Sequence, residues 1–287
     1  MPSKKTKALL TTLISALFFS VMAIFVKIVA TRISGMEILF VRAIFSLAIM
    51  GLIMYWNKWT KVRNIKMLSV RAIAGGIAVA FYFTAIQRIP LSAAVLLGNS
   101  YPIFAVLFSS IFIKEKPKYD SLMVLMIAFV GMFLILDPKF GQIDVGYIFG
   151  LMSAIFGGLA VTAIKVLRRT DSSWAIAYAQ MVGAVLVVGV FMPASFVMPN
   201  INEWGFLLII AICGIAAQVF FTRPFKFVPT AEGTFVAPMY AALTVLLSVI
   251  FLGEVLSGRF VLGASLVFGG MIYLILREEI KIKKNIL

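Results

Sequence analysis

Ionisable and amide side chains lie within long apolar runs of this sequence, where they could bind a polar solute. Arg42 lies seven residues into an apolar run that begins at residue 35, about 10 Å deep if the run is helical. A charge there costs about 2.5–3.5 kcal/mol on insertion scales, so the guanidinium needs an anion or a carbonyl as its partner. Glu37 is the nearest acid, but five residues turn a helix by about 140°, so the two side chains do not share a face. Arg42 therefore pairs with an acid on another helix or binds a carboxylate or phosphate of a solute.

Polar groups near the middle of other apolar runs are further candidates. Asn99 and Tyr101 should point to opposite faces of a continuous helix, because two residues correspond to about 200°. Tyr101 shares its face with the small residues Ala94 and Gly98, which favour close helix packing, so Asn99 is the better solute-binding candidate. Each of the other candidates either joins two helices or touches solute, because its polar tip needs a partner in hydrocarbon. They are Tyr82, Gln180, Gln218 and Tyr240.

Charged residues close to the ends of apolar runs have simpler explanations. Glu232 lies in the first turn of a predicted helix, where the helix dipole favours an acid. Proton coupling is the alternative role for Glu232, and Glu37 is the second coupling candidate. Lys27 and Lys165 lie near helix ends, where a long side chain can reach the headgroups. Arg71 lies near the start of its apolar run, and we interpret it as interfacial.

The residue types in this sequence give little support for catalysis or metal binding. The sequence has no His, a single cysteine at Cys213 and only scattered acids. It has no Cys pair with metal-ligand spacing and no Gly-rich phosphate-binding motif. We therefore expect no cofactor and no metal, and neither a metalloenzyme nor an ATP-driven pump.

The composition indicates that membrane helices position these side chains. Of the 287 residues, 62% are hydrophobic and 13% are charged, with a mean hydropathy of +1.08, whereas soluble domains are about half apolar and a quarter charged. A bilayer crossing needs about 20 apolar residues, so this length accommodates ten short-looped helices. We predict helices at 8–29, 35–56, 68–88, 91–112, 120–136, 146–167, 172–192, 204–222, 230–252 and 259–276.

The distribution of basic residues predicts the orientation in the membrane. The net charge is +15, but the basic residues lie between apolar runs, so the lipid bilayer rather than nucleic acid is the expected partner. With the N-terminus inside, eighteen Lys and Arg residues fall in the inner segments and four in the outer segments. This bias predicts a multi-pass inner-membrane protein with both termini in the cytoplasm. A homodimer is one assembly that the sequence allows.

An internal repeat divides the chain into two halves. A shift of 139 residues aligns IPLSAAVLLGNSYPIFAVLFSSIFIKE with VPTAEGTFVAPMYAALTVLLSVIFLGE without a gap, placing Tyr101 on Tyr240. A shift of 138 places Lys27 on Lys165 and Arg42 on Gln180. We predict repeats at 8–136 and 146–276. Because each has five helices, the second enters the membrane from the opposite side. The fold class is therefore an all-α integral membrane protein with a 5+5 inverted-topology repeat, an arrangement that places transporter substrates near mid-bilayer.

The run FYFTAIQRIPLSAAVLLGNSYPIFAVLFSSIFIKEKP resembles the EamA domain of the drug/metabolite transporter superfamily. The resemblance rests on its aromatic pair, Pro90, mid-helix Pro102 and terminal Glu115, and FVPTAEGTFVAPMYAALTVLLSVIFLGE repeats it more loosely. It implies a ten-helix secondary transporter whose cavity is lined by helices 1, 3, 4, 6, 8 and 9. Pro238 aligns with Asn99 rather than with Pro102, so a strictly two-fold cavity is not expected.

The expected function is secondary transport of a small organic metabolite, such as an amino acid or a related amphipathic solute, by alternating access. S-adenosylmethionine or a nucleoside-type metabolite is the alternative cargo. Alternatives of another class are a non-transporting membrane subunit and a membrane enzyme. The enzyme lacks a clustered nucleophile, base or metal site, and the subunit leaves the inverted duplication unexplained.

Overall fold

The structure is a computed structural model that describes residues 3–57, 62–89, 91–137, 144–190, 196–252 and 258–284. All regular structure in these ranges is helical. The helices are α1 (Lys4–Val29), α2 (Gly35–Trp56), α3 (Ile65–Arg88), α4 (Leu91–Gly98), α5 (Tyr101–Phe112), α6 (Tyr119–Leu136), α7 (Val145–Leu167), α8 (Ser173–Val190), α9 (Ile201–Thr222), the 3-10 turn η1 (Pro224–Lys226), α10 (Thr230–Gly233), α11 (Val236–Leu252) and α12 (Gly258–Lys284).

Ten helical segments result, because α4 continues into α5 and α10 into α11 across two-residue interruptions at 99–100 and 234–235. The prediction that the fourth and ninth helices are continuous is therefore wrong. Pro102 and Pro238 follow the interruptions, and each lacks the N–H that would bond the carbonyl four residues earlier. The two interruptions do not fall at equivalent positions of the repeat, so the halves are not identical.

Polar caps determine where several helices begin. The Asn64 side chain accepts a hydrogen bond from the Met67 N–H at 3.0 Å, so α3 starts at Ile65, about one turn before the predicted start. Capping boxes start α2 at Ser34 and α9 at Asn200. The early start of α3 carries Arg71 deeper into the bundle.

The helices pack in two equivalent sets. In one set α3 lies against α7 and α8, and in the other α9 lies against α1 and α2. The α3–α8 contact is close, because a Cβ at Gly183 would lie 1.9 Å from the Ala72 carbonyl oxygen and one at Gly76 would lie 2.5 Å from the Gly183 carbonyl oxygen. Small side chains thus let the two backbones approach closely.

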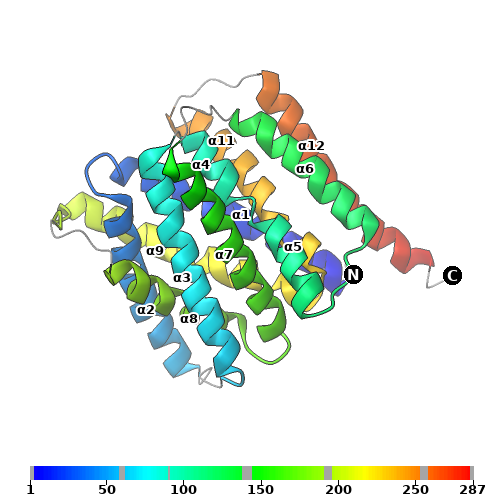
Figure 1. The fold of residues 1–287 in the computed structure, drawn as a ribbon, viewed down its shortest axis with the longest axis horizontal. Coiled ribbons are helices and arrows are strands. Elements are labelled where there is room, and N and C mark those ends of the chain that lie inside the picture. The colour runs from blue at the N-terminus through cyan, green and yellow to red at the C-terminus, as the bar shows by residue number, and fades with distance from the viewer. Residues whose placement is uncertain are drawn as a thin grey trace.

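The fifth helix of each half, α6 and α12, forms a pair at the edge of the bundle (Figure 1). A Cβ at Gly131 of α6 would lie 2.7 Å from the Gly263 carbonyl oxygen of α12, and a Cβ at Gly270 of α12 would lie 3.1 Å from Val124 of α6. The later residue of one helix meets the earlier residue of the other, so the pair is antiparallel. This is the arrangement that a five-helix inverted repeat requires, and the predicted fold class is confirmed.

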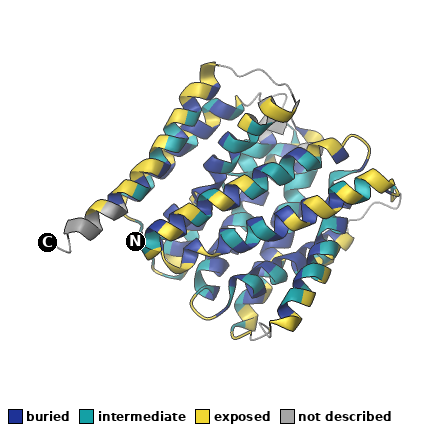
Figure 2. Cartoon of the chain, turned by 180° about the vertical axis from the view of Figure 1, so that it is seen from behind, coloured by how far each residue is buried: buried dark blue, intermediate teal, exposed yellow. Residues whose placement is uncertain are grey.

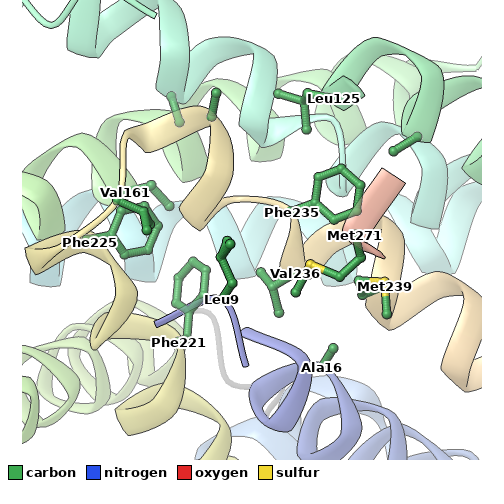
Figure 3. Close-up of a cluster of buried hydrophobic side chains, with 14 of the residues drawn as sticks. Leu9, Ala16, Leu125, Val161, Phe221, Phe225, Phe235, Val236, Met239 and Met271 are labelled. Carbon is green, nitrogen blue, oxygen red and sulfur yellow. The ribbon is translucent and has the colours of Figure 1, made fainter. Parts of the chain in front are cut away.

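Apolar side chains cover the outside of the bundle as well as its core. Exposed residues lie along the outward helix faces (Figure 2), and they include Phe112 at 64% and Leu186 at 64% exposure. Among the described residues, nine helical spans are long and apolar enough to cross a membrane. The largest core cluster joins α1, α6, α7, α9, α11 and α12 through side chains such as Leu9, Phe221 and Phe235 (Figure 3).

Candidate functional site

Two adjoining cavities lie inside the bundle and share Met22 and Tyr240 in their linings. The smaller, about 220 Å³, is here termed the deep pocket, and residues of α1, α3, α5, α7, α8, α9 and α11 and Asn99 line it. The larger, about 750 Å³, is termed the mouth pocket, and it is lined mainly by α1, the segment after it, α2, α3 and α11. Its lining includes exposed Lys27 and Thr31, so it reaches the surface at the end of the bundle where α1 stops.

The six residues predicted to bind solute all line these two pockets. Asn99, Gln180 and Gln218 line the deep pocket, Arg42 and Tyr82 line the mouth pocket, and Tyr240 lines both. They come from both halves of the chain, as the pseudo-two-fold arrangement requires. Their contact with a solute remains a prediction.

The Arg42 guanidinium lies against α9 at Gly214, where a Cβ would come within 2.7 Å of its Nε. In the described ranges Arg42 forms no ion pair, and its buried Nε has no hydrogen-bond partner. The described structure therefore offers no acid on another helix to neutralise it. Gln180 occupies the equivalent position in the other half, with its Oε1 1.8 Å from the Cβ that Gly75 lacks. Two glycines at equivalent repeat positions thus accommodate two polar side chains.

Arg71 is a cavity residue that the sequence interpretation placed at the membrane interface. It is 4% exposed, lines the deep pocket and donates from Nη2 to Gln218 Oε1 at 3.2 Å, while its Nε has no partner. The interfacial interpretation is wrong, because it began the third helix at 68 rather than at Ile65. The Asn64 cap is the sequence signal that would have located it.

Asn99 and Tyr101 both line the deep pocket, so the prediction that they point to opposite sides is wrong. The helix is interrupted between them, and the rotation of a continuous helix does not apply. Asn99 donates from Nδ2 to the Val95 carbonyl at 2.9 Å, leaving its side-chain oxygen as an acceptor for other groups. Tyr101 packs edge-on against Phe221, with ring centroids 6.4 Å apart.

The coupling candidate Glu232 does not line either pocket. It is 1% exposed, and its Oε1 accepts from Arg277 Nη2 at 2.5 Å and from Ser121 Oγ at 2.8 Å. Arg277 also donates from Nη1 to Asp120 at 2.7 Å. This ion cluster joins α10, α6 and α12, so the charge of Glu232 serves helix packing here.

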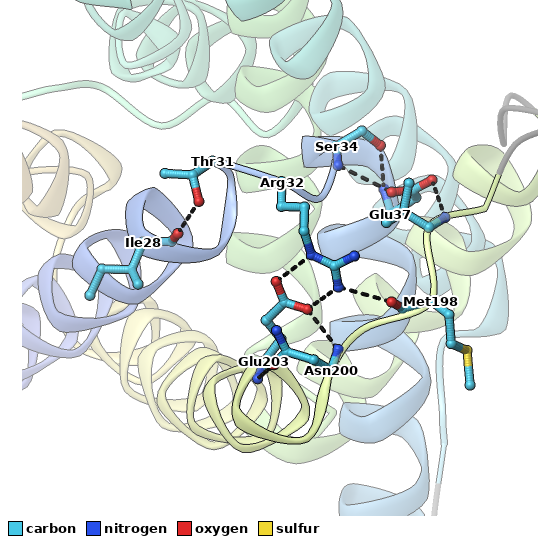
Figure 4. A network of polar contacts seen from close by, with 9 residues as sticks. Ile28, Thr31, Arg32, Ser34, Glu37, Met198, Asn200 and Glu203 are labelled. Carbon is cyan, nitrogen blue, oxygen red and sulfur yellow. Dashed lines mark hydrogen bonds and ion pairs between the residues drawn. The ribbon is translucent and has the colours of Figure 1, made fainter.

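Glu37 likewise lies outside both pocket linings. It accepts from the Ser34 N–H at 3.1 Å within its capping box and from the Val197 N–H at 3.2 Å (Figure 4). Beside it, the Arg32 guanidinium bonds both Glu203 oxygens and the Met198 carbonyl. Donation of hydrogen bonds from the Arg32 guanidinium to the Glu203 carboxylate raises the pKa of Arg32. These contacts dock the segment after α1 against the segment before α9.

A second set of polar contacts lies at the opposite end of the bundle. Lys165 Nζ donates to the Val228 carbonyl at 2.6 Å and lies 3.6 Å from Glu115 Oε1. Glu115 accepts from the Thr230 N–H at 2.9 Å, so it caps α10. Lys165 therefore points into a protein contact rather than to the headgroups. Glu254, its repeat equivalent, lies outside the described residues.

No group of three His, Cys, Asp or Glu side chains that could hold a metal occurs in the described parts of the chain. What the pockets offer instead is guanidinium, amide and phenol groups beside apolar walls. Such a lining suits recognition of an amphipathic organic solute.

Comparisons with known proteins agree with this description. The EamA-like transporter family model matches residues 6–137 and 144–276. A pseudopaline exporter of Pseudomonas aeruginosa is 32% identical over 220 residues, covering 76% of this chain and 78% of that protein. Human solute carrier family 35 member G1 is 24% identical, over 88% of this chain and 76% of that protein. A crystal structure with a TM-score of 0.79 and 19% identity covers 97% of this chain and 100% of that chain, which shows a shared fold.

Proposed function

Because the chain belongs to the EamA-like transporter family, and is thus a multi-pass membrane transporter rather than an enzyme, we propose that it is a secondary active transporter of a small organic metabolite. The cargo is an amino acid or a related amphipathic solute, carried across the cytoplasmic membrane by alternating access. The observation that carries this proposal is the pair of adjoining pockets, to which both halves contribute polar residues. Among the described residues, the Arg42 guanidinium in the mouth pocket has no acid partner.

Alternating access follows from the opposed halves, which we assign to residues 8–136 and 146–276. The mouth pocket reaches the surface where α1 ends, whereas the deep pocket abuts the core cluster through Val161, Phe221 and Val236. The bias of basic residues supports a cytoplasmic location for both termini. In that orientation the mouth faces outside, and this conformation is outward-facing.

Export is the direction that the relatives favour, because the Pseudomonas aeruginosa relative is named as an exporter of a metabolite. Intact cells with and without the protein distinguish the directions. Export raises the extracellular level of the solute, whereas uptake raises its internal level.

Solute flux in proteoliposomes tests the proposal. A panel of amino acids, nucleosides, S-adenosylmethionine and vitamins includes both the favoured and the alternative cargo classes. We expect at least one solute to cross faster than in protein-free vesicles. Absence of flux across the whole panel, together with copurification of a stoichiometric partner, would favour a non-transporting subunit instead.

Replacing Arg42 tests its role in binding. Arg42→Gln should leave a folded protein, because Gln occupies the equivalent position 180 and the guanidinium forms no ion pair within the described residues. Loss of a charge-assisted hydrogen bond of about 1.5–3 kcal/mol should weaken solute affinity roughly 10- to 150-fold. Thermal unfolding in detergent and the concentration dependence of flux, measured on the same variant, check both expectations. Early melting would reveal a structural role, and unchanged flux would eliminate a binding role.

A further inference from the structure

Two guanidinium groups lie on the same face of α9. Arg42 packs against Gly214, and Arg71 donates to the side chain of Gln218. Gly214 and Gln218 are four residues apart, which is about one helical turn or roughly 6 Å along the axis. The cationic ends of Arg42 and Arg71 therefore contact α9 at successive turns, one in the mouth pocket and one in the deep pocket.

The same arrangement recurs on α3. Gln180 of α8 packs against Gly75, four residues from Arg71 and so on the same face of α3. The Gln180 Oε1 is buried and has no hydrogen-bond partner. Two cations and two amides thus converge where α2 and α9 meet α3 and α8.

Within the described residues, no acid in either pocket lining offsets the positive charge of Arg42 and Arg71. The described lining residues of both pockets include no Asp or Glu. The Nε atoms of both Arg42 and Arg71 lack partners. A buried guanidinium without an acid partner carries a desolvation cost, and an anionic group bound at each of Arg42 and Arg71 offsets that cost.

We propose that the transported solute carries two anionic groups, as a dicarboxylate or dicarboxylic amino acid does, with one group bound by Arg42 and the other by Arg71. Met22 and Tyr240, which line both pockets, contact the chain that joins the two groups. Gln180 Oε1 accepts a hydrogen bond from an N–H of an amino acid solute. This inference rests on the proposed transport function, because it names the class of solute that is carried. A binding measurement nevertheless tests it separately from a flux measurement.

Isosteric ligand pairs that differ by a single charge provide the test. Binding of succinate against succinamate, and of glutamate against glutamine, is measured by titration calorimetry on the full purified chain. We expect the member with two carboxylates to bind at least about tenfold more tightly, as a charged hydrogen-bond partner implies. Arg42→Gln and Arg71→Gln should each remove this preference. Arg88→Gln is the matched control, because Arg88 is exposed and lies outside both pocket linings, and it should retain the preference.

The outcomes separate the two proposals. Equal affinity for both members of each pair, no binding of either dicarboxylate, or a preference that survives both substitutions overturns the inference. If neutral solutes nevertheless cross the proteoliposome membrane, the transport proposal stands without the dicarboxylate inference. Selective binding of the dicarboxylates without flux of any solute supports the inference and contradicts transport. If Arg71→Gln does not fold, Arg71→Lys keeps the charge but loses the planar fork, and it should retain part of the preference.

Discussion

Replacing Gly183 by alanine should destabilise the protein by about 3 kcal/mol or more and abolish transport. The added Cβ would lie 1.9 Å from the Ala72 carbonyl oxygen and 2.4 Å from its carbon. Because both are backbone atoms, no rotamer change relieves the contact, and α3 and α8 must move apart. Overpacking costs about 1–3 kcal/mol where side chains can adjust, and a backbone clash lies at or above the top of that range. Separating the helices also withdraws Gln180 from Gly75, which disrupts the site.

Thermal unfolding in detergent and proteoliposome flux measure this effect. Gly205→Ala and Gly269→Ala are matched controls, because no atom lies within 4 Å of a Cβ at either position. Each control should be neutral or stabilising by up to about 1 kcal/mol, since alanine favours helix over glycine. Equal stability of Gly183→Ala and Gly205→Ala would show that α3 and α8 are not closely packed.

Removing Arg277 should cost about 3–5 kcal/mol of stability, because it leaves the carboxylate of Glu232, 1% exposed, without its cation. Arg277→Gln also breaks the contact with Asp120, so α12 loses two attachments. The double variant Arg277→Gln/Glu232→Gln should recover much of the loss, since it removes both buried charges. A double-mutant cycle on unfolding free energies measures the coupling between the pair.

An exposed ion pair supplies the comparison for this cycle. Arg259 and Asp137 lie 2.5 Å apart with side chains 65% and 59% exposed, so Arg259→Gln should cost no more than about 1 kcal/mol. A cost for Arg277→Gln as small as that for Arg259→Gln would contradict a buried, functioning ion cluster.

The lengths of the apolar runs are sufficient to predict the number of helices, because a bilayer crossing requires an apolar run of nearly fixed length. The sequence also predicts the two halves, since the shift that aligns Tyr101 with Tyr240 also aligns Gly75 with Gly214. The packing of α3 against α7 and α8, and of α9 against α1 and α2, could not be predicted, because pairing depends on side-chain fit between distant segments.

The residues of the candidate site were only partly predictable from the sequence. Polar residues in apolar runs stand out, so Arg42 and Gln218 were identified, whereas Arg71 was missed through an error of one turn in a helix start. The position of Tyr101 in the pocket lining was missed because the spacing of residues does not reveal that the helix is interrupted before it. Pro102 was a signal for the interruption, but a proline can be tolerated in a membrane helix when neighbouring groups satisfy the freed carbonyl.

The α6–α12 pair has the form of an isologous subunit interface, in which each partner contributes both complementary surfaces. Gly131 meets Gly263, and the reciprocal contact joins Gly270 to Val124. The chain is therefore organised as a C2 dimer whose subunits have been covalently joined. In a true dimer every substitution appears twice, so a lone arginine at the axis is impossible. Covalent joining removes that constraint, and it permits an arginine at position 42 of one half where the equivalent position 180 of the other half is a glutamine.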